Sequence, residues 1–256
     1  MRPGIDAAQA LGLTAPDSRP PAPDDEVIRA VQALRAGQVV AIPTDTVYGL
    51  AAAIDRHDAI EQLYSIKGRP AEKAIPILIS EAGHVDRLTA RLSAPAAHLA
   101  RELWPGALTL VLPALPGLPQ AVTTINSSGT ETVAVRVPDH ALARSIIAGA
   151  GGALAVTSAN RSGAAPAVEA EEVRRLGLPP TVFVVDGGRA PGGAPSTIVD
   201  ATTETPEILR EGAIPTSAIA AALANVEPSA STELRARYDL DMIEQQGRRG
   251  PQDVTP

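Results

Sequence analysis

Two short stretches in the first third of the chain concentrate hydroxyl, carboxylate and cationic side chains. Residues 43–50 read Pro-Thr-Asp-Thr-Val-Tyr-Gly-Leu and directly follow an apolar run. Lys67, Arg69 and Lys73 lie close together after the next predicted helix. Polar side chains at a strand end are typical of ligand sites in open α/β sheets, and neighbouring cations in an acidic protein indicate a bound anion. The two stretches therefore predict a pocket for an anionic ligand.

Both stretches also have an ordinary structural interpretation. The threonines and the aspartate of residues 43–50 could cap a strand-to-helix turn. The three cations could form a solvated basic loop that favours the C-terminal end of a helix. The residues alone leave both alternatives open.

A single arginine within a buried strand is the next candidate. Residues 132–137 form an apolar run that contains Arg136, and a cation in such a run is costly unless it meets an anion. That anion could be a ligand, or it could be an Asp or Glu of the chain itself. Hydroxyl groups end further predicted strands at Thr46, Ser158 and Ser196. These strand-end positions are compatible with one pocket shared with Arg136.

The residue types exclude several kinds of site. The chain has no cysteine, and its four histidines lack a metal-ligand spacing. Neither a P-loop nor a dinucleotide fingerprint occurs, and the candidates include no Ser-His or carboxylate pair. Cations, hydroxyls and an amide suit a reaction in which the protein positions anions and stabilises charge.

Apolar patterns predict one α/β domain over residues 24–225. Strands are expected at residues 38–42, 74–79, 107–112, 132–137, 154–156, 182–185, 197–199 and 207–210. Helices are expected from a cap at Asp24 or Asp25 to Gly37, at 55–66, from a Ser93 cap to 103, from an Asp139 cap to 147, at 169–176 and at 217–224. Residues 86–92 should form a short helix or turn, and residues 113–130 a loop long enough to be a mobile flap.

Composition sets the remaining bounds. Residues 1–23 contain five prolines and are expected to be an extension, and residues 226–256 a polar tail that is partly disordered. A net charge of -7, with one Trp, one Phe and three Tyr, argues against nucleic-acid binding by a broad basic or base-stacking surface. The sequence shows neither a membrane-spanning run nor a secretory segment, so a cytoplasmic location is expected.

The ordered motifs resemble those of a known family. Residues 43–50, followed by Lys-Gly-Arg-Pro at 67–70, are similar to the signature of the YrdC-like family, the threonylcarbamoyl-AMP synthases of tRNA modification. Matching blocks follow in the same order at 105–109, 133–138, 157–160, 196–200 and 209–210. The resemblance extends from about Val27 to Gly212. Some relatives carry a second C-terminal domain, which we expect to be absent here because few residues follow.

The resemblance implies a fold, a reaction and a set of site residues. The fold would be a twisted mixed sheet flanked by helices, with a concave, positively lined cavity in a catalytic domain at 24–225. L-Threonine, bicarbonate and ATP would give threonylcarbamoyl-AMP and pyrophosphate. The threonine site would comprise Thr46, Arg136, Ser158 and Ser196. The ATP site would comprise the catalytic residues Lys67 and Arg69 together with Lys73, Thr132, Asn160 and Arg210.

The resemblance also implies partners and leaves rival functions. Mg²⁺ would accompany ATP, and the product would pass to tRNA threonylcarbamoyl-transferase proteins, with a weak tRNA contact allowed. Leu78 stands where many relatives have a histidine, which puts one part of threonine recognition in doubt. An RNA-binding or ribosome-maturation module of the same fold is the main alternative. A carbamoyl-transfer enzyme is a further one, although the chain lacks the length and cysteines of such proteins.

Overall fold

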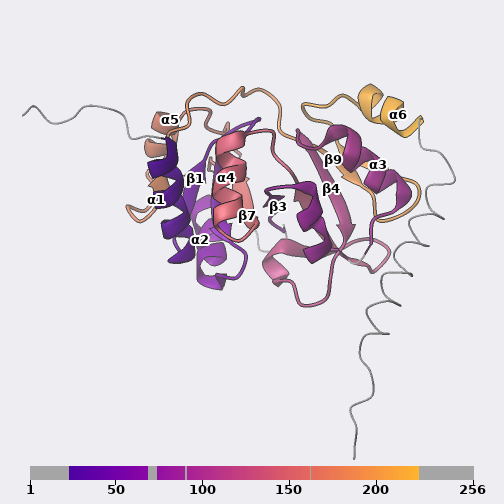
Figure 1. Cartoon of the computed structure of the whole chain (residues 1–256), viewed down its shortest axis with the longest axis horizontal. Coiled ribbons are helices and arrows are strands. Elements are labelled where there is room, and N and C mark those ends of the chain that lie inside the picture. Colours follow the sequence, from indigo (N-terminus) through magenta and orange to yellow (C-terminus); the bar gives the residue numbers. More distant parts are fainter. Residues whose placement is uncertain (1–22, 69–73, 90, 162, 225–256) are drawn as a thin grey trace, which may run out of the picture.

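The computed structural model describes residues 23–68, 74–89, 91–161 and 163–224, which form one mixed ten-stranded sheet with helices around it (Figure 1). The strands are β1 (Val40–Ile42), β2 (Gly49–Ala53), β3 (Ile77–Ile79), β4 (Leu108–Pro113), β5 (Thr123–Ile125), β6 (Glu131–Arg136), β7 (Ala153–Ser158), β8 (Phe183–Val184), β9 (Thr197–Asp200) and β10 (Glu207–Arg210). The helices are α1 (Pro23–Arg35), α2 (His57–Lys67), α3 (Ala94–Leu103), α4 (Ala141–Gly149), α5 (Ala170–Arg174) and α6 (Thr216–Ala224), with short 3-10 turns η1 (Ala82–Arg87) and η2 (Gln120–Val122).

The sheet mixes parallel and antiparallel neighbours, as the family resemblance implies. Its order is β10-β9-β4-β6-β3-β7-β2-β1-β8, and β5 pairs with β6 outside this path. The pairs β1/β8, β3/β6 and β4/β9 are parallel, while the others are antiparallel. Strands far apart in the sequence therefore lie side by side, and β3 and β6 join the two halves of the sheet.

Two clusters of buried apolar residues cover the two faces of the sheet. Helices α1 and α4 pack Leu34 and Ile146 against Leu154 of β7 on one face. Helices α2 and α3 contribute Leu63 and Leu99 to the larger cluster, which includes alternate residues of β3, β4 and β6. Because successive strand residues point to opposite faces, Val133 and Val135 belong to the larger cluster and Arg136 lies on the other face, beside Leu78 of β3.

The connection after β1 differs from the sequence prediction. We expected a strand followed by a turn into a helix, but the polar stretch is the loop of an antiparallel hairpin between β1 and β2. Strand β2 is made of small residues apart from Leu50 and is fully buried between β1 and β7. A Cβ atom on Gly49 would lie 2.6 Å from Val156 Cγ1, so only glycine allows this close approach of β2 to β7.

Other elements confirm or correct the predicted boundaries. The Ser93 hydroxyl caps α3 as predicted and accepts a hydrogen bond of 3.2 Å from the Ala96 amide. Helix α4 is capped by His140 and not by Asp139, because the imidazole Nδ1 reaches the Ala143 amide at 3.3 Å. Helix α1 begins at Pro23, so neither predicted aspartate precedes it. Residues 113–130 contain η2 and β5 and are not one unstructured flap.

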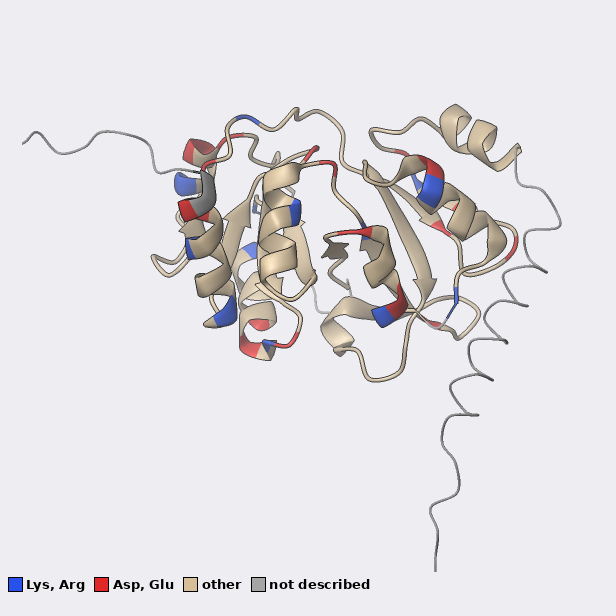
Figure 2. Cartoon of the chain, viewed as in Figure 1, with Lys and Arg blue, Asp and Glu red and all other residues tan. Residues whose placement is uncertain are grey.

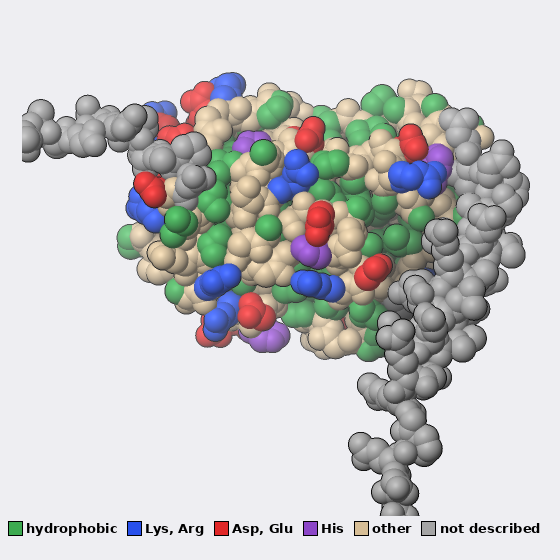
Figure 3. Space-filling model, viewed as in Figure 1, with side chains coloured by type: hydrophobic (Ala, Val, Ile, Leu, Met, Phe, Trp, Pro, Cys, Tyr) green, Lys and Arg blue, Asp and Glu red, His purple; other side chains and the backbone are tan. Residues whose placement is uncertain are grey.

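Charged residues are interspersed over the described surface. In the view of Figure 2, basic and acidic residues lie near one another on the outer helices, and Figure 3 shows this face without an area that cations alone cover. The predicted extension at 1–23 and tail at 226–256 lie almost entirely outside the described residues. Within the described part of the chain, no helix is long and apolar enough to cross a membrane.

Candidate active site

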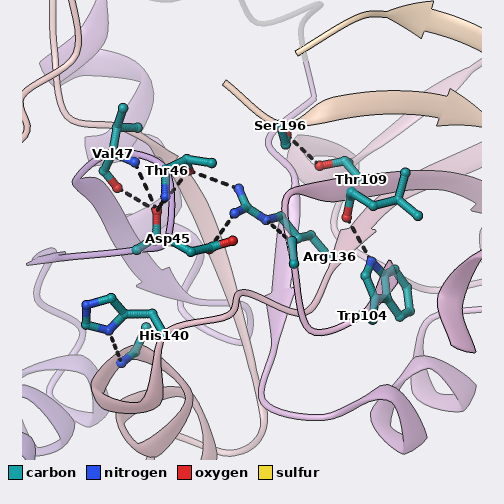
Figure 4. Close-up of polar contacts among 12 residues, drawn as sticks. Asp45, Thr46, Val47, Trp104, Thr109, Arg136, His140 and Ser196 are labelled. Atoms are coloured by element: carbon teal, nitrogen blue, oxygen red, sulfur yellow. Dashed lines mark hydrogen bonds and ion pairs between the residues drawn. The ribbon is translucent and has the colours of Figure 1, made fainter. Parts of the chain in front are cut away.

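Arg136, the last residue of β6, is the centre of the candidate site (Figure 4). Its side chain is buried, and its Nε donates to the Gly106 carbonyl at 2.9 Å. Nη1 donates to Thr46 Oγ1 at 3.1 Å, and Nη2 donates to Asp45 Oδ1 at 2.5 Å. Of the two partners that the sequence left open for Arg136, this structure contains the internal carboxylate.

The hairpin loop that presents Asp45 and Thr46 is held by Thr44. The Thr44 hydroxyl donates to the Val47 carbonyl at 2.6 Å and accepts from the Thr46 and Val47 amides, both at 3.2 Å. It also lies 3.0 Å from the Thr46 hydroxyl. A buried hydroxyl that binds its own backbone over three positions stabilises a turn, so both residues reach Arg136 from a fixed loop.

The segment between β8 and β9 packs on the same loop. The Gly192 amide donates to the Thr46 carbonyl at 2.8 Å, and the Tyr48 hydroxyl donates to the Gly188 carbonyl at 2.7 Å. Burial is the main cause that raises the pKa of Tyr48 above its usual value, so this phenol remains a neutral donor. The loop is therefore held from within by Thr44 and from outside by this segment.

Ser196 and Arg210 lie on the other side of Arg136. The hydroxyls of Thr109 and Ser196 are 2.8 Å apart, and Arg210 Nη2 donates to the Ser196 carbonyl at 2.7 Å. Burial and then repulsion from Arg136 lower the pKa of Arg210. Among the residues that the structure describes, Asp45 is the carboxylate bonded to either of these two guanidinium groups, and it is bonded to Arg136, so the region attracts a further anionic group.

A second polar group forms at the C-terminal end of α2. Lys67 is buried, and its Nζ donates to Ser158 O, Ser158 Oγ and Asn160 Oδ1, each at 2.8 Å. The Ser158 hydroxyl also donates to Asn160 Oδ1 at 2.7 Å. Gly68, in the left-handed conformation, ends the helix immediately after Lys67. The side chains of Lys67, Ser158 and Asn160 therefore act as one hydrogen-bonded unit.

The hairpin loop connects the two groups. Gly49, which follows Thr46 by three positions, pairs with Ser158 where β2 lies beside β7. The Ala159 amide donates a hydrogen bond to the Tyr48 carbonyl at 2.8 Å. A hollow of about 190 Å³ borders Asn160 and is also lined by Ile66, Leu176 and Leu178. The β1–β2 hairpin thus borders both the polar group around Arg136 and the polar group around Lys67.

The predicted residues divide accordingly. Thr46 and Arg136 touch, and Ser196 and Arg210 adjoin them. Ser158 bonds Lys67 and Asn160 rather than the residues around Arg136. Thr132 is buried on β6 and donates to the Thr124 carbonyl, and none of its described hydrogen bonds reaches either group. Arg69 and Lys73 lie outside the described residues.

Sequence reasoning gave no role to three residues near Arg136. Asp45 stood between two selected threonines, which was a signal, and Thr109 ended a motif block at 105–109. His140 had no recognisable signal in the sequence. Burial lowers the pKa of His140, against the opposing effects of Asp45 and Asp139, so its imidazole favours the neutral form beside the Asp45 carboxylate.

Comparison with known proteins identifies the family of this chain. The family model for Sua5, YciO and YrdC proteins, whose description is telomere recombination, matches residues 32–212. This chain belongs to the Sua5/YciO/YrdC family. The expected resemblance is therefore confirmed.

Relatives within the family differ in length. The threonylcarbamoyl-AMP synthase of Bacillus subtilis is 38% identical over 191 residues, which are 75% of this chain and 54% of that protein. The threonylcarbamoyl-AMP synthase of Thiobacillus denitrificans is 36% identical over 170 residues, which are 66% of this chain and 88% of that protein. The chain thus spans about half the length of the Bacillus relative and most of the Thiobacillus relative.

A solved family structure has the same fold. Sua5 of Pyrococcus abyssi, crystallised in complex with L-threonine, is 32% identical and superposes with a TM-score of 0.71, covering 82% of this chain and 60% of that chain. The likeness confirms the predicted α/β fold with a twisted mixed sheet and flanking helices. The ligand belongs to the Pyrococcus protein.

Proposed function

We propose that this chain is a threonylcarbamoyl-AMP synthase, which forms threonylcarbamoyl-AMP and pyrophosphate from L-threonine, bicarbonate and ATP. The observation that carries the proposal is the hydrogen bond between Thr46 and Arg136, beside a second arginine, Arg210, that is repelled by Arg136 and bonded to Ser196. The Bacillus and Thiobacillus relatives bear this name. Buried arginine and hydroxyl groups are suited to an amino-acid carboxylate.

The chemistry requires positioning more than side-chain reactivity. The amine of threonine and bicarbonate-derived CO2 form a carbamate, and a carbamate oxygen then bonds to the α-phosphorus of ATP. The bond from that phosphorus to the bridging oxygen of the β-phosphate breaks, and pyrophosphate leaves with the electron pair. Because the carbamate is already an anion, cations that neutralise the phosphates and hold the two reactants in line supply the main effect.

The nucleotide site would include the polar group formed by Lys67 and Asn160. In this proposal Lys67 and Asn160, together with Arg69, Lys73, Thr132 and Arg210, contact ATP, and Ser158 completes the threonine site. The Ser158 hydroxyl is bound to Lys67 and Asn160, which supports a place for Ser158 at the junction of the two substrates. Lys67 and Arg69 would stabilise charge on the phosphates during transfer.

Mg²⁺ would enter as part of the ATP substrate. Within the described ranges, no group of three His, Asp or Glu side chains is arranged to hold a metal. In this proposal the ion is held by phosphate oxygens and water rather than by several protein ligands. The product would be passed to tRNA threonylcarbamoyl-transferase proteins, and because tRNA is the final acceptor we expect a cytoplasmic location.

The test is a substrate-omission assay. The purified chain is incubated with MgATP, L-threonine and bicarbonate, while pyrophosphate is quantified and the adenylate product is identified by mass spectrometry. We expect pyrophosphate above background only when all three substrates are present. Equal pyrophosphate release without threonine would rule out the proposed function.

A further inference from the structure

We propose that Asp45 receives the α-ammonium group of the amino-acid substrate, so that Asp45 and Arg136 together recognise a zwitterion. This inference rests on the proposed function and assigns a recognition role to a residue that sequence reasoning had passed over. Asp45 lies in the β1–β2 loop next to Thr46, and its side chain approaches Arg136 from the side opposite Ser196 (Figure 4).

The Asp45 carboxylate has one oxygen engaged and one available. Oδ1 accepts from Arg136 Nη2 at 2.5 Å, whereas Oδ2 accepts no hydrogen bond from the residues that the structure describes. The Asp45 side chain is 14% exposed and that of Arg136 is 7% exposed. A carboxylate oxygen accepts more than one hydrogen bond, so a small cation can reach this group without displacing the arginine.

Arg136 likewise has donors left for a carboxylate. Within the described part of the chain, three of its five N–H groups are used, by Gly106, Thr46 and Asp45. Each terminal nitrogen therefore has one N–H group remaining. A pair of such N–H groups binds a carboxylate in a two-point arrangement, so the substrate carboxylate and Asp45 can contact the same guanidinium.

The charges around Arg136 are arranged along one direction. Asp45 is on one side, while Arg210, whose Nη2 contacts Ser196, is on the other and repels Arg136. An α-amino acid carries its ammonium and carboxylate on one carbon atom. Its ammonium can therefore point to Asp45 while its carboxylate lies between the two arginines.

A purely supporting role for Asp45 explains less of this geometry. The Arg136 guanidinium is already fixed at two further points, by the Gly106 carbonyl and by the Thr46 hydroxyl. Orientation of Arg136 thus has two other sources. Asp45 adds a negative charge, whereas the other described partners of Arg136 are neutral, and a negative charge favours an amino acid over a simple carboxylate.

The test separates charge recognition from support of Arg136. Binding of L-threonine and of (R)-3-hydroxybutyrate, which lacks only the amine, is measured by calorimetry for the wild type, Asp45→Asn and Asp45→Glu. Asparagine keeps an oxygen for Arg136 but removes the charge. We expect Asp45→Asn to weaken threonine binding by about tenfold or more and to leave the affinity for hydroxybutyrate unchanged or higher, while Asp45→Glu recovers part of the loss.

Two results would overturn the inference. One is an equal loss for threonine and hydroxybutyrate in Asp45→Asn, which would mean that Asp45 only supports Arg136. The other is unchanged threonine binding in Asp45→Asn. If hydroxybutyrate binds too weakly to measure in the wild type, the ratio of threonine affinities between Asp45→Glu and Asp45→Asn decides, and equal affinities would reject the role.

Controls keep this inference distinct from the proposed function. Asp139→Asn removes one charge from an exposed neighbour of His140 and should leave threonine binding unchanged. Unchanged ATP affinity of Asp45→Asn, also by calorimetry, verifies that the variant is folded. If the wild type makes pyrophosphate from the three substrates while Asp45→Asn binds threonine normally, the inference fails and the function stands. If omission of threonine does not alter pyrophosphate release by the wild type, the proposed function is rejected, whatever the result for Asp45→Asn.

Discussion

Arg136 is a buried cation whose neighbours determine what it can bind. Removing a guanidinium group from water is costly, and Asp45, Thr46 and the Gly106 carbonyl compensate that cost. Arg210 adds to the cost of burying this positive charge, because the two guanidinium groups repel each other. Stability and ligand binding are therefore coupled at this one side chain.

The Arg136–Asp45 pair should contribute to folding as a unit. Arg136→Met keeps most of the side-chain volume but leaves Asp45 without its partner, which should lower the free energy of unfolding by about 3 kcal/mol. Adding Asp45→Asn to that variant should restore part of the loss, because the unpaired carboxylate is gone. Urea denaturation of both single variants and the double variant measures the coupling, and additive effects would show that the two residues act independently.

His140 makes a separate, pH-dependent contribution. Burial lowers the pKa of His140 below 6.5, so as pH falls through 6.5 the unfolded chain takes up a proton that the folded chain resists. The free energy of unfolding should therefore fall more steeply below about pH 6.5 in the wild type than in His140→Asn, which retains a capping side chain. Urea denaturation at pH 7.5 and 5.5 checks this, and equal pH dependence in the two proteins would contradict it.

At the level of elements, the hairpin loop between β1 and β2 is the structure that assembles the site. Its Asp45 and Thr46 side chains contact Arg136, and its far end leads into Gly49, which pairs with Ser158. The loop is short, polar and buried at Thr44 and Thr46. A displacement of this loop would therefore disturb both polar groups together.

Thr44 should be the main support of that loop. Thr44→Val keeps the shape but removes a hydroxyl that bonds the Val47 carbonyl and two backbone amides, which should destabilise the protein by about 2 kcal/mol. Threonine binding should weaken because Thr46 and Asp45 lose their fixed positions. Thr44→Ser, which keeps the hydroxyl, should retain most of both properties in denaturation and calorimetry. Equal behaviour of the two variants would argue against the role of the hydroxyl.

Elements with large apolar residues were predictable from the sequence, and β2 was not. Strands β4, β6, β7 and β10 lie at or near their expected ranges because their apolar runs are distinct. Strand β2 consists of Gly-Leu-Ala-Ala-Ala, and these residues, apart from leucine, have little intrinsic preference for strands. It is a strand because β1 and β7 pair with its two edges, which local sequence does not reveal.

The members of the site could be selected from sequence, but their contacts could not. Most were assigned through the family resemblance of their motifs, and Asp45 and Thr109 were not assigned a role. Arg136 and Asp45 are 91 positions apart, and Thr109 and Ser196 are 87 apart. Which carboxylate would meet Arg136 depends on how β6 lies relative to the β1–β2 loop, and that follows from the strand order of the whole sheet.

On the scale of the whole molecule, the candidate site lies where the two halves of the sheet meet. Figure 1 shows β1, β7, α1 and α4 in one half and β4, β9 and α3 in the other. Arg136 ends β6, at the junction, while Thr46 belongs to the first half and Ser196 directly precedes β9 in the second. A ligand that contacts all three would link the two halves.

Substrates should therefore stabilise the folded chain measurably and in combination. A ligand that binds only the folded state adds about 2.7 kcal/mol to the free energy of unfolding when present at 100 times its Kd. Threonine and MgATP should each raise the melting temperature, and together they should raise it by more than the sum, because Ser158 of the proposed threonine site is hydrogen-bonded to Lys67 of the proposed ATP site. Thermal unfolding with each ligand, with both, and with serine or GTP as controls measures this. A strictly additive shift would mean that the two ligands bind independently, and no shift with threonine would contradict the assignment of Thr46, Arg136 and Ser196 to its site.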